Sequence, residues 1–224
     1  TTKAEHKAVL DTCAFLEEDG FEVTYLDVDS EGLISIDMLN KTLRPETILV
    51  SILYANNETG TIQPINEISK LTHENGSLLF SDTTQALGKV DLSKVFQLVD
   101  FACFSAHKIY GPKGIGLVFI KDNEDENGLP SFIQGGGQQR KQRGGTINTP
   151  LIVGFSKAIE LAYENFQVET ECLKILRNKL EAGLLKIDLA ISNSKTPLRL
   201  PNTVHISFPY VDGTTLLTAL SGKI

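Results

Sequence analysis

The sequence has few cysteines and no long hydrophobic run. Only 3 cysteines occur among its 224 residues, and no two of them stand in a Cys-x-x-Cys pair. This usage fits a reducing compartment, predicts a cytoplasmic protein and argues against a zinc or other metal site. No apolar stretch approaches the ~20 residues that span a bilayer, and no segment resembles a secretory signal peptide. We therefore expect no membrane partner.

Positive charge is also in deficit. The chain carries 21 lysine and arginine residues against 28 aspartate and glutamate residues, a net charge of -7. An acidic balance argues against a nucleic-acid-binding surface. The exception is the cluster Arg140-Lys141-Gln142-Arg143, which lies between two glycine-rich segments. A solvated loop would explain this cluster, but contact with a phosphate or an anionic substrate is the interpretation that we favour.

The order of apolar segments predicts an α/β fold. Short apolar runs over 77–81 and 99–104 are typical of buried strands, and a helix over 64–72 precedes the first of them. Alternation of strand and helix at this spacing is typical of a parallel sheet flanked by helices. Further predicted helices cover 4–18, 148–165, 168–185 and 214–220, further strands cover 21–26, 48–54, 115–120 and 201–208, and an exposed loop covers 121–130.

Two polar residues follow strands of this predicted sheet. Asp82 follows the run at 77–81, and Lys108 comes shortly after the run at 99–104. Ligands of open parallel sheets bind beyond the carboxyl ends of the strands, so both side chains are expected in one crevice. There, a lysine can form a Schiff base with a carbonyl cofactor and an aspartate can keep a pyridine nitrogen protonated, which suits pyridoxal phosphate. A plain salt bridge between Asp82 and a lysine is the alternative that these two residues leave open.

Other polar residues have ordinary structural explanations. Asn56 and Asn57 could form a turn, although their place after a predicted buried strand favours a role in the same crevice. Cys13, Cys103 and Cys172 lie in helix-like or strand-like apolar segments, and we interpret them as packing residues. None of the three is expected to carry sulfur, because a reactive thiol needs exposure and a nearby positive charge.

Six short segments along the chain each resemble a motif of one known protein family. They are Thr2-Lys3-Ala4-Glu5-His6-Lys7-Ala8-Val9-Leu10-Asp11, Ala55-Asn56-Asn57-Glu58-Thr59-Gly60, Asp82-Thr83-Thr84-Gln85, Ser105-Ala106-His107-Lys108, Gly135-Gly136-Gly137-Gln138-Gln139-Arg140 and Arg143-Gly144-Gly145-Thr146. These segments resemble the motifs of cysteine desulfurases in the class-V aminotransferase family. The Arg-Gly-Gly-Thr segment follows the triple glycine at a short distance, and this spacing favours the NifS/IscS-like group over the SufS-like group. The implied fold is that of fold-type I pyridoxal-phosphate transferases, with a mostly parallel sheet.

The resemblance implies a role for each matching residue around the cofactor ring. Lys108 would hold pyridoxal phosphate as a Schiff base, and His6 would stack on the ring and assist proton transfer. Asp82 would pair with the pyridine nitrogen. Gln85 and Asn57 would lie near the ring hydroxyl, where an amide can orient a phenol-like oxygen.

The resemblance also implies contacts to the cofactor phosphate. Ser105 and His107 would donate hydrogen bonds to it. Thr146 would reach the phosphate of a neighbouring subunit, which makes the expected active unit a homodimer. Two positions depart from the family pattern, since Ala106 stands where glycine is usual and Gly144 where serine is common. Both residues are small, so we expect local backbone adjustment and no loss of cofactor.

The implied activity is conversion of L-cysteine to L-alanine, with sulfur passed on as a persulfide. The expected partners are a sulfur acceptor or an iron–sulfur scaffold protein, and the sulfur would serve cluster assembly or thiolation. A selenocysteine lyase shares the fold, the cofactor and most of these residues, so it stays open. A non-catalytic homologue in a sulfur-transfer complex, or an inert fragment, is a third possibility.

The resemblance further implies that family parts lie outside the chain. A phosphate loop would precede Thr1, while the sulfur-accepting cysteine and a substrate-binding arginine would follow Ile224. The expected domains are a large cofactor-binding domain over 1–166 and the beginning of a smaller α+β domain over 167–224. On this interpretation the chain alone would hold the cofactor poorly and would be inactive. An organelle also stays open as its location.

Overall fold

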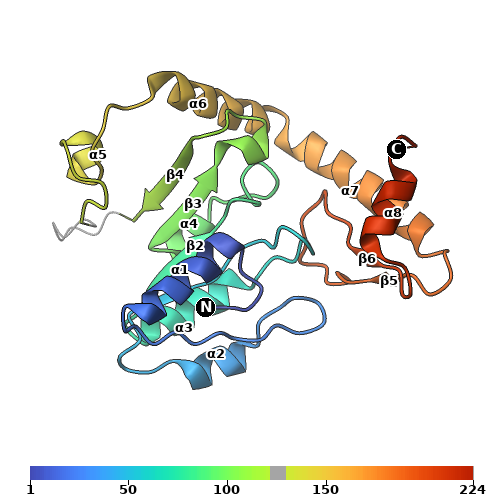
Figure 1. Ribbon diagram of the computed structural model, residues 1–224, viewed down its shortest axis with the longest axis horizontal. Helices are drawn as coiled ribbons and strands as arrows, with labels where there is room; N and C mark the ends of the chain where they lie inside the picture. The colour runs from blue at the N-terminus through green and yellow to red at the C-terminus, as the bar shows by residue number, and fades with distance from the viewer. Residues whose placement is uncertain (122–129, 224) are drawn as a thin grey trace. The chain divides into compact units, whose positions relative to one another are not determined.

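The computed structural model describes residues 1–121 and 130–223, and its chain forms two compact units. The first unit contains Thr1–Thr42, Ala55–Pro64 and Gln167–Ile224, and the second contains Leu43–Tyr54 and Ile65–Phe166. The positions of the two units relative to one another are not determined (Figure 1). The predicted boundary at residue 166 coincides with one edge of the second unit, whereas two earlier segments group with the C-terminal residues. The division of a complete protein into a large and a small domain stays a prediction.

A four-stranded sheet of order β1-β2-β3-β4 forms the centre of the second unit (Figure 1). Neighbouring strands β1, β2 and β3 are parallel, and β4 is antiparallel to β3. The last connection runs only from Ser105 to Gly116, which is too short for the crossover that parallel pairing needs. The sheet is therefore mostly parallel, as predicted. Its strands are β1 (Leu49–Ser51), β2 (Leu78–Asp82), β3 (Phe101–Ser105) and β4 (Gly116–Ile120).

Helices cover this sheet with apolar faces. Helix α3 packs against β2, and its residues Ile65 and Ile68 are buried. Helix α6 begins after Asn148, whose side chain accepts a hydrogen bond from the backbone N–H of Leu151 and so caps the helix. The helices of this unit are α3 (Ile65–Glu74), α4 (Val95–Leu98), the 3-10 helix η1 (Ala106–Ile109), α5 (Gln138–Lys141) and α6 (Thr149–Glu164).

The core of the second unit is aliphatic. Ile52, Leu79, Val99 and Ala102 are almost fully buried between the sheet and its helices. Burial of each large aliphatic side chain contributes roughly 1.5–3 kcal/mol, which holds the strand ends at fixed positions.

The first unit is built around a loop that pairs with a distant segment. Thr61 forms an antiparallel bridge with Arg199, and the backbone N–H of Leu200 donates to the carbonyl of Gly60 at 2.7 Å. The loop over 55–64 is thereby tied to residues 198–200. The elements of this unit are α1 (Lys7–Glu18), α2 (Ile36–Thr42), α7 (Phe166–Leu184), β5 (Ile191–Ser192), β6 (Ile206–Ser207) and α8 (Gly213–Leu220).

Several predicted boundaries need correction. The strand predicted over 21–26 is wrong, because only Leu26 pairs there, in an isolated bridge to Thr2. The strand predicted over 48–54 is assigned only as β1, although Tyr54 still donates a backbone hydrogen bond to Asp82. The helix predicted from residue 4 begins at Lys7. The sequence pattern also missed α2, α4, α5 and β5.

The loop predicted over 121–130 lies almost wholly outside the described residues. Among the helices that are described, none combines the length and apolar character that a membrane crossing needs.

Candidate active site

One face of the sheet gathers polar groups at the ends of β2 and β3. The strand register sets Asp82 opposite Cys103, so these side chains lie on the same face. Ser105 lies two residues beyond Cys103 and therefore shares that face. Its side chain does not cap η1 and forms no hydrogen bond with another described residue, so its hydroxyl can donate to a ligand.

The Asp82 carboxylate contacts both the turn after β2 and the Cys103 thiol of the neighbouring strand. The backbone N–H of Thr84 donates to Asp82 Oδ1 at 2.9 Å, and the Thr83 hydroxyl donates to the carbonyl of Cys103 at 2.8 Å. Asp82 is half-buried, and no described lysine, arginine or histidine forms an ion pair with it. A half-buried carboxylate without a cation is suited to a cationic ligand atom, because pairing would offset its desolvation.

The lysine predicted to react lies on the 3-10 helix directly after β3. Lys108 and His107 belong to η1 and are exposed. Tyr110, the residue directly after η1, has a φ of 63° and ends this short helix in the left-handed region. Lys108 forms no ion pair with any described carboxylate, so the alternative of an Asp82–Lys108 salt bridge is not the arrangement found.

A second lysine accompanies Gln85 in the turn after β2. The Lys89 ammonium donates to Gln85 Oε1 at 2.7 Å, and both residues are half-buried. Burial, followed by repulsion from Lys108, lowers the pKa of Lys89 from 10.5 to about 8. Sequence reasoning missed Lys89, although its i,i+4 spacing from Gln85 within a helical turn is a usable signal.

The cysteines differ in their surroundings. Burial, followed by the charge of Asp82, raises the pKa of the Cys103 thiol to about 12, so its reactive thiolate is disfavoured. Cys13 is buried, as expected of a packing residue. Cys172 is exposed, so its interpretation as a packing residue is wrong. Cys172 lies on α7 among apolar residues that are themselves largely exposed, so no described segment covers it.

His6 and Asn57 belong to the first unit, so the structure does not place them relative to the Asp82 cluster. Within their own unit the two segments touch, because the Asn56 side chain donates to the Ala4 carbonyl at 3.0 Å. His6 is the N-cap of α1 and its Nδ1 accepts from the backbone N–H of Ala8, which leaves Nε2 as its outward nitrogen. Both His6 and Asn57 are exposed.

The two neighbouring asparagines have different roles. Asn56 is the turn former, since its Oδ1 accepts from the backbone N–H groups of Glu58 and Thr59. The Asn57 side chain forms no hydrogen bond within the described part of the chain, so its amide can bind a ligand.

Thr146 is exposed on the segment between α5 and α6 and lies apart in sequence from the strand-end cluster. Nearby, Gly144 is buried and its N–H donates to the Ile133 carbonyl. A Cβ at Gly144 would lie 2.5 Å from the Gln134 carbonyl oxygen, which explains why this backbone needs glycine.

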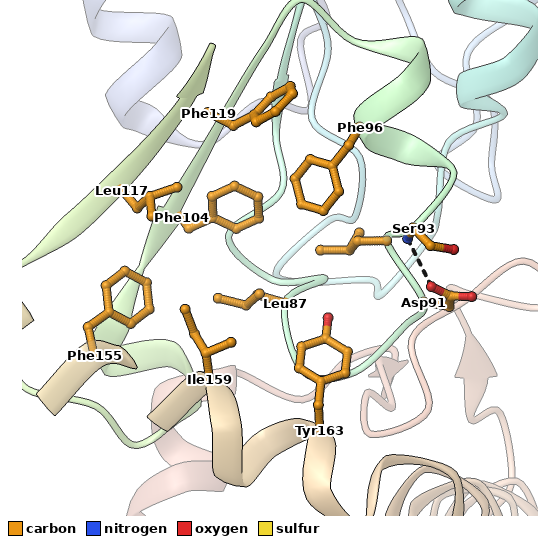
Figure 2. A pocket seen from close by; sticks show the side chains of 11 residues that line it. Leu87, Asp91, Ser93, Phe96, Phe104, Leu117, Phe119, Phe155, Ile159 and Tyr163 are labelled. Atoms are coloured by element: carbon orange, nitrogen blue, oxygen red, sulfur yellow. Dashed lines mark hydrogen bonds between the residues drawn. The ribbon is translucent and has the colours of Figure 1, made fainter. Parts of the chain in front are cut away.

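The opposite face of β3 borders an apolar cavity of about 430 Å³ (Figure 2). Figure 2 shows Phe96 near Phe104 and Phe119, with ring centroids 6.0 and 5.0 Å from that of Phe96. None of the predicted site residues lines this cavity. Phe104 alternates with Cys103 and Ser105, so the cavity and the polar cluster lie on different faces of the sheet.

No group of three or more His, Cys, Asp or Glu residues in the described ranges could hold a metal ion. A family model described as Aminotransferase class-V matches residues 1–223. The chain belongs to the class-V aminotransferase family. The predicted family is thereby confirmed, and so is its fold-type I architecture with a mostly parallel sheet. Enzymes of this family use pyridoxal phosphate, which is the cofactor that the sequence predicted.

This class-V aminotransferase chain is similar to proteins named cysteine desulfurase IscS. The protein of Clostridium botulinum is 46% identical over 223 residues, which cover 98% of this chain and 55% of the relative. That of Methanosarcina thermophila is 44% identical over 223 residues, covering 100% and 54%. The chain thus spans about half the length of the curated relatives that it matches.

Solved structures agree with this family. A structure titled "NIFS-LIKE PROTEIN" has a TM-score of 0.92 and 40% identity, covering 99% of this chain and 60% of its own. One titled "SspA in complex with cysteine" has a TM-score of 0.77 and 33% identity, covering 100% and 61%.

The strand-end residues fit pyridoxal phosphate. Asp82 offers a carboxylate that forms no ion pair with a described cation, which suits a protonated pyridine nitrogen. Lys108 offers an exposed amine that pairs with no carboxylate of residues 1–121 and 130–223, and Ser105 offers a hydroxyl that no described group uses. This donor set matches the three parts of the cofactor: nitrogen, aldehyde and phosphate.

Proposed function

We propose that the complete protein is a pyridoxal-phosphate-dependent cysteine desulfurase, which converts L-cysteine to L-alanine and passes sulfur on as a persulfide. The observation that carries this proposal is the placement of the Asp82 carboxylate at the end of β2 and of the Lys108 amine after β3, neither of which forms an ion pair with a described residue. Relatives named cysteine desulfurase, and the solved relative whose title includes cysteine, support this substrate.

Residues of this chain would hold the cofactor at both of its ends. Lys108 would bind its aldehyde carbon, and Asp82 would accept a hydrogen bond from its ring nitrogen. Ser105 and His107 would donate to its phosphate, as their positions at the start of η1 allow. When bound, the cofactor supplies an electron-withdrawing ring that stabilises negative charge at the substrate α-carbon.

Proton handling falls to three side chains. The Asp82 carboxylate would keep a proton on the ring nitrogen of the bound cofactor, because a nearby negative charge favours a cation. The Lys108 amine would act as a general base that takes a proton from the substrate α-carbon. His6 presents Nε2 outward and is suited to proton transfer near neutral pH.

Amide groups would orient the phenol-like oxygen of the cofactor. Gln85 can donate through its Nε2 because Lys89 occupies its Oε1. Asn57 would be the second such donor.

The assembly and its partners are also proposals. Thr146 is exposed and would contact the phosphate held by a second subunit of a homodimer. The sulfur would pass to an acceptor or iron–sulfur scaffold protein, and the location would be cytoplasmic.

Alanine release from L-cysteine by the complete protein tests the proposal, with pyridoxal phosphate and a thiol reductant present. We expect alanine and sulfide in equal amounts. Lys108→Ala should abolish alanine release and the absorbance band of the lysine-bound cofactor, because no other residue is proposed to bind the aldehyde. Lys113→Ala, at an exposed lysine in the next turn, should retain both.

Alanine from selenocysteine but not from cysteine would contradict the proposal and indicate a lyase. Alanine release that survives Lys108→Ala would contradict the assigned role of Lys108.

A further inference from the structure

Lys89 is a half-buried cation with an unusual partner. Its side-chain hydrogen bond goes to a neutral amide, Gln85 Oε1, and it forms no ion pair in the described ranges. A partly desolvated ammonium normally pairs with a carboxylate, because an unpaired buried charge is unfavourable. The lowered pKa of Lys89, caused first by burial and then by Lys108, reflects this cost.

The backbone holds Lys89 in place. The Lys89 N–H donates to the Ala86 carbonyl at 3.0 Å, and the N–H of Gly88 donates to the Tyr163 hydroxyl of α6 at 3.3 Å. Gly88 has a φ of +67°, and a Cβ there would lie 2.9 Å from the Cβ of Ala162. The turn is thus packed closely against α6, so the Lys89 side chain starts from a fixed point.

The contact dictates which end of the Gln85 amide is free. The charged Lys89 ammonium can only donate and an amide NH₂ can only donate, so below about pH 8 Lys89 bonds to the carbonyl end of the amide. The Nε2 of Gln85 is then the end left for a ligand. Without Lys89 the amide could rotate by half a turn and present its oxygen, which would repel a phenol-like oxygen.

We propose that Lys89 is a positioning residue that locks the Gln85 amide with its NH₂ toward the ring oxygen of the cofactor. This inference rests on the proposed function only in naming pyridoxal phosphate as the ligand. It requires that the effect of Lys89 on cofactor binding pass through Gln85.

A double-mutant cycle on cofactor affinity tests this requirement. The complete protein and its Lys89→Met, Gln85→Ala and doubly substituted variants are each titrated with pyridoxal phosphate, and the dissociation constant and absorbance band are recorded. We expect Lys89→Met to weaken binding roughly tenfold and to shift the band, since one well-oriented hydrogen bond is lost and one repulsive contact is gained. In the Gln85→Ala background, Lys89→Met should add less than about twofold.

Two further variants separate positioning from folding. Lys89→Arg keeps a donor and should restore most of the affinity, whereas Lys70→Met, at an exposed lysine on α3, should bind like the unsubstituted protein. If Lys89→Met does not fold, Lys89→Ala replaces it, since it likewise removes the donor to Gln85 Oε1 and has a smaller side chain. Equal losses from Lys89→Met with and without Gln85, or no loss in either background, would overturn the inference.

The outcomes distinguish this inference from the proposed function. Protein that binds pyridoxal phosphate but releases no alanine would contradict the desulfurase reaction while leaving the cycle valid. Protein that fails to bind the cofactor at all would overturn both.

Discussion

The Glu181–Arg199 ion pair links α7 to the segment that holds the Asn57 loop. Arg199 donates to Glu181 Oε1 at 2.8 Å and also to Oε2, and Ser192 Oγ donates to Oε1 at 2.7 Å. The two side chains are only 13% and 11% exposed. Because Arg199 forms the bridge to Thr61, this pair supports the backbone of the loop at 55–64. We therefore choose Glu181→Gln as the perturbation.

The substitution should leave a buried guanidinium without its counter-charge. Breaking such a pair costs ~3–5 kcal/mol when both partners are fully buried. Arg199 keeps its hydrogen bond to the Ser194 carbonyl, and both side chains retain slight exposure, so we expect a loss of about 3 kcal/mol. At this size the effect exceeds that of nearly all surface substitutions.

The loss should depend on pH in one direction. The Arg199 hydrogen bond holds the pKa of Glu181 below its ordinary value of 4.5. A lowered folded-state pKa stabilises the protein fully above the unfolded value, and this contribution disappears as the pH falls through the folded value. The difference between the unsubstituted protein and Glu181→Gln should therefore be constant from pH 7 to pH 5 and should shrink below about pH 4.5.

Urea unfolding followed by far-ultraviolet circular dichroism at pH 7 and pH 4 measures both quantities. The matched control is Glu160→Gln on α6, which removes an exposed pair with Lys157 and should cost less than ~1 kcal/mol at either pH. A loss below ~1 kcal/mol for Glu181→Gln at pH 7 would refute the reasoning, as would a difference that grows on acidification.

Two other predictions concern backbone and thiols. Gly60→Ala should lower the free energy of unfolding by at least ~2 kcal/mol, because Gly60 has a φ of +77° and a Cβ there would lie 2.7 Å from Thr203 Cβ. Gly76→Ala is the control: Gly76 has a φ of +79° but open space around it, so the loss should be only ~1 kcal/mol. Equal losses from the two substitutions would contradict the predicted clash with Thr203. In timed alkylation at pH 8 followed by mass spectrometry, exposed Cys172 should react well before Cys103, because the pKa of the half-buried Cys103 is raised to about 12. Faster labelling of Cys103 would contradict this raised pKa.

Much of the second unit could be predicted from local pattern. The runs at 77–81 and 99–104 appear as β2 and β3, and the predicted helix at 64–72 appears as α3. These predictions are confirmed because the spacing of apolar residues in each segment matches the face of the helix or strand that is buried. The strand predicted over 21–26 failed, because its residues find only one bridging partner and a strand needs a neighbour along its length.

Candidate site residues were found partly by position and partly by resemblance. Asp82 and Lys108 followed from strand ends alone, since parallel strands deliver their next residues to one edge. His6, Asn57 and Thr146 lie far from them in sequence and depended on the family motifs. Lys89 was missed by both, because its importance lies in a contact and not in a motif.

The sequence by itself determined which residues could form strands and helices, which polar groups follow the strands, and to which family the chain belongs. Only the tertiary structure decided that β4 runs antiparallel, that Asp82 shares a face with Cys103, and that Arg199 meets Glu181. The physical reason is range. Propensity and periodicity act within a few residues, whereas register and buried ion pairs depend on packing between segments that the chain brings together only when it folds.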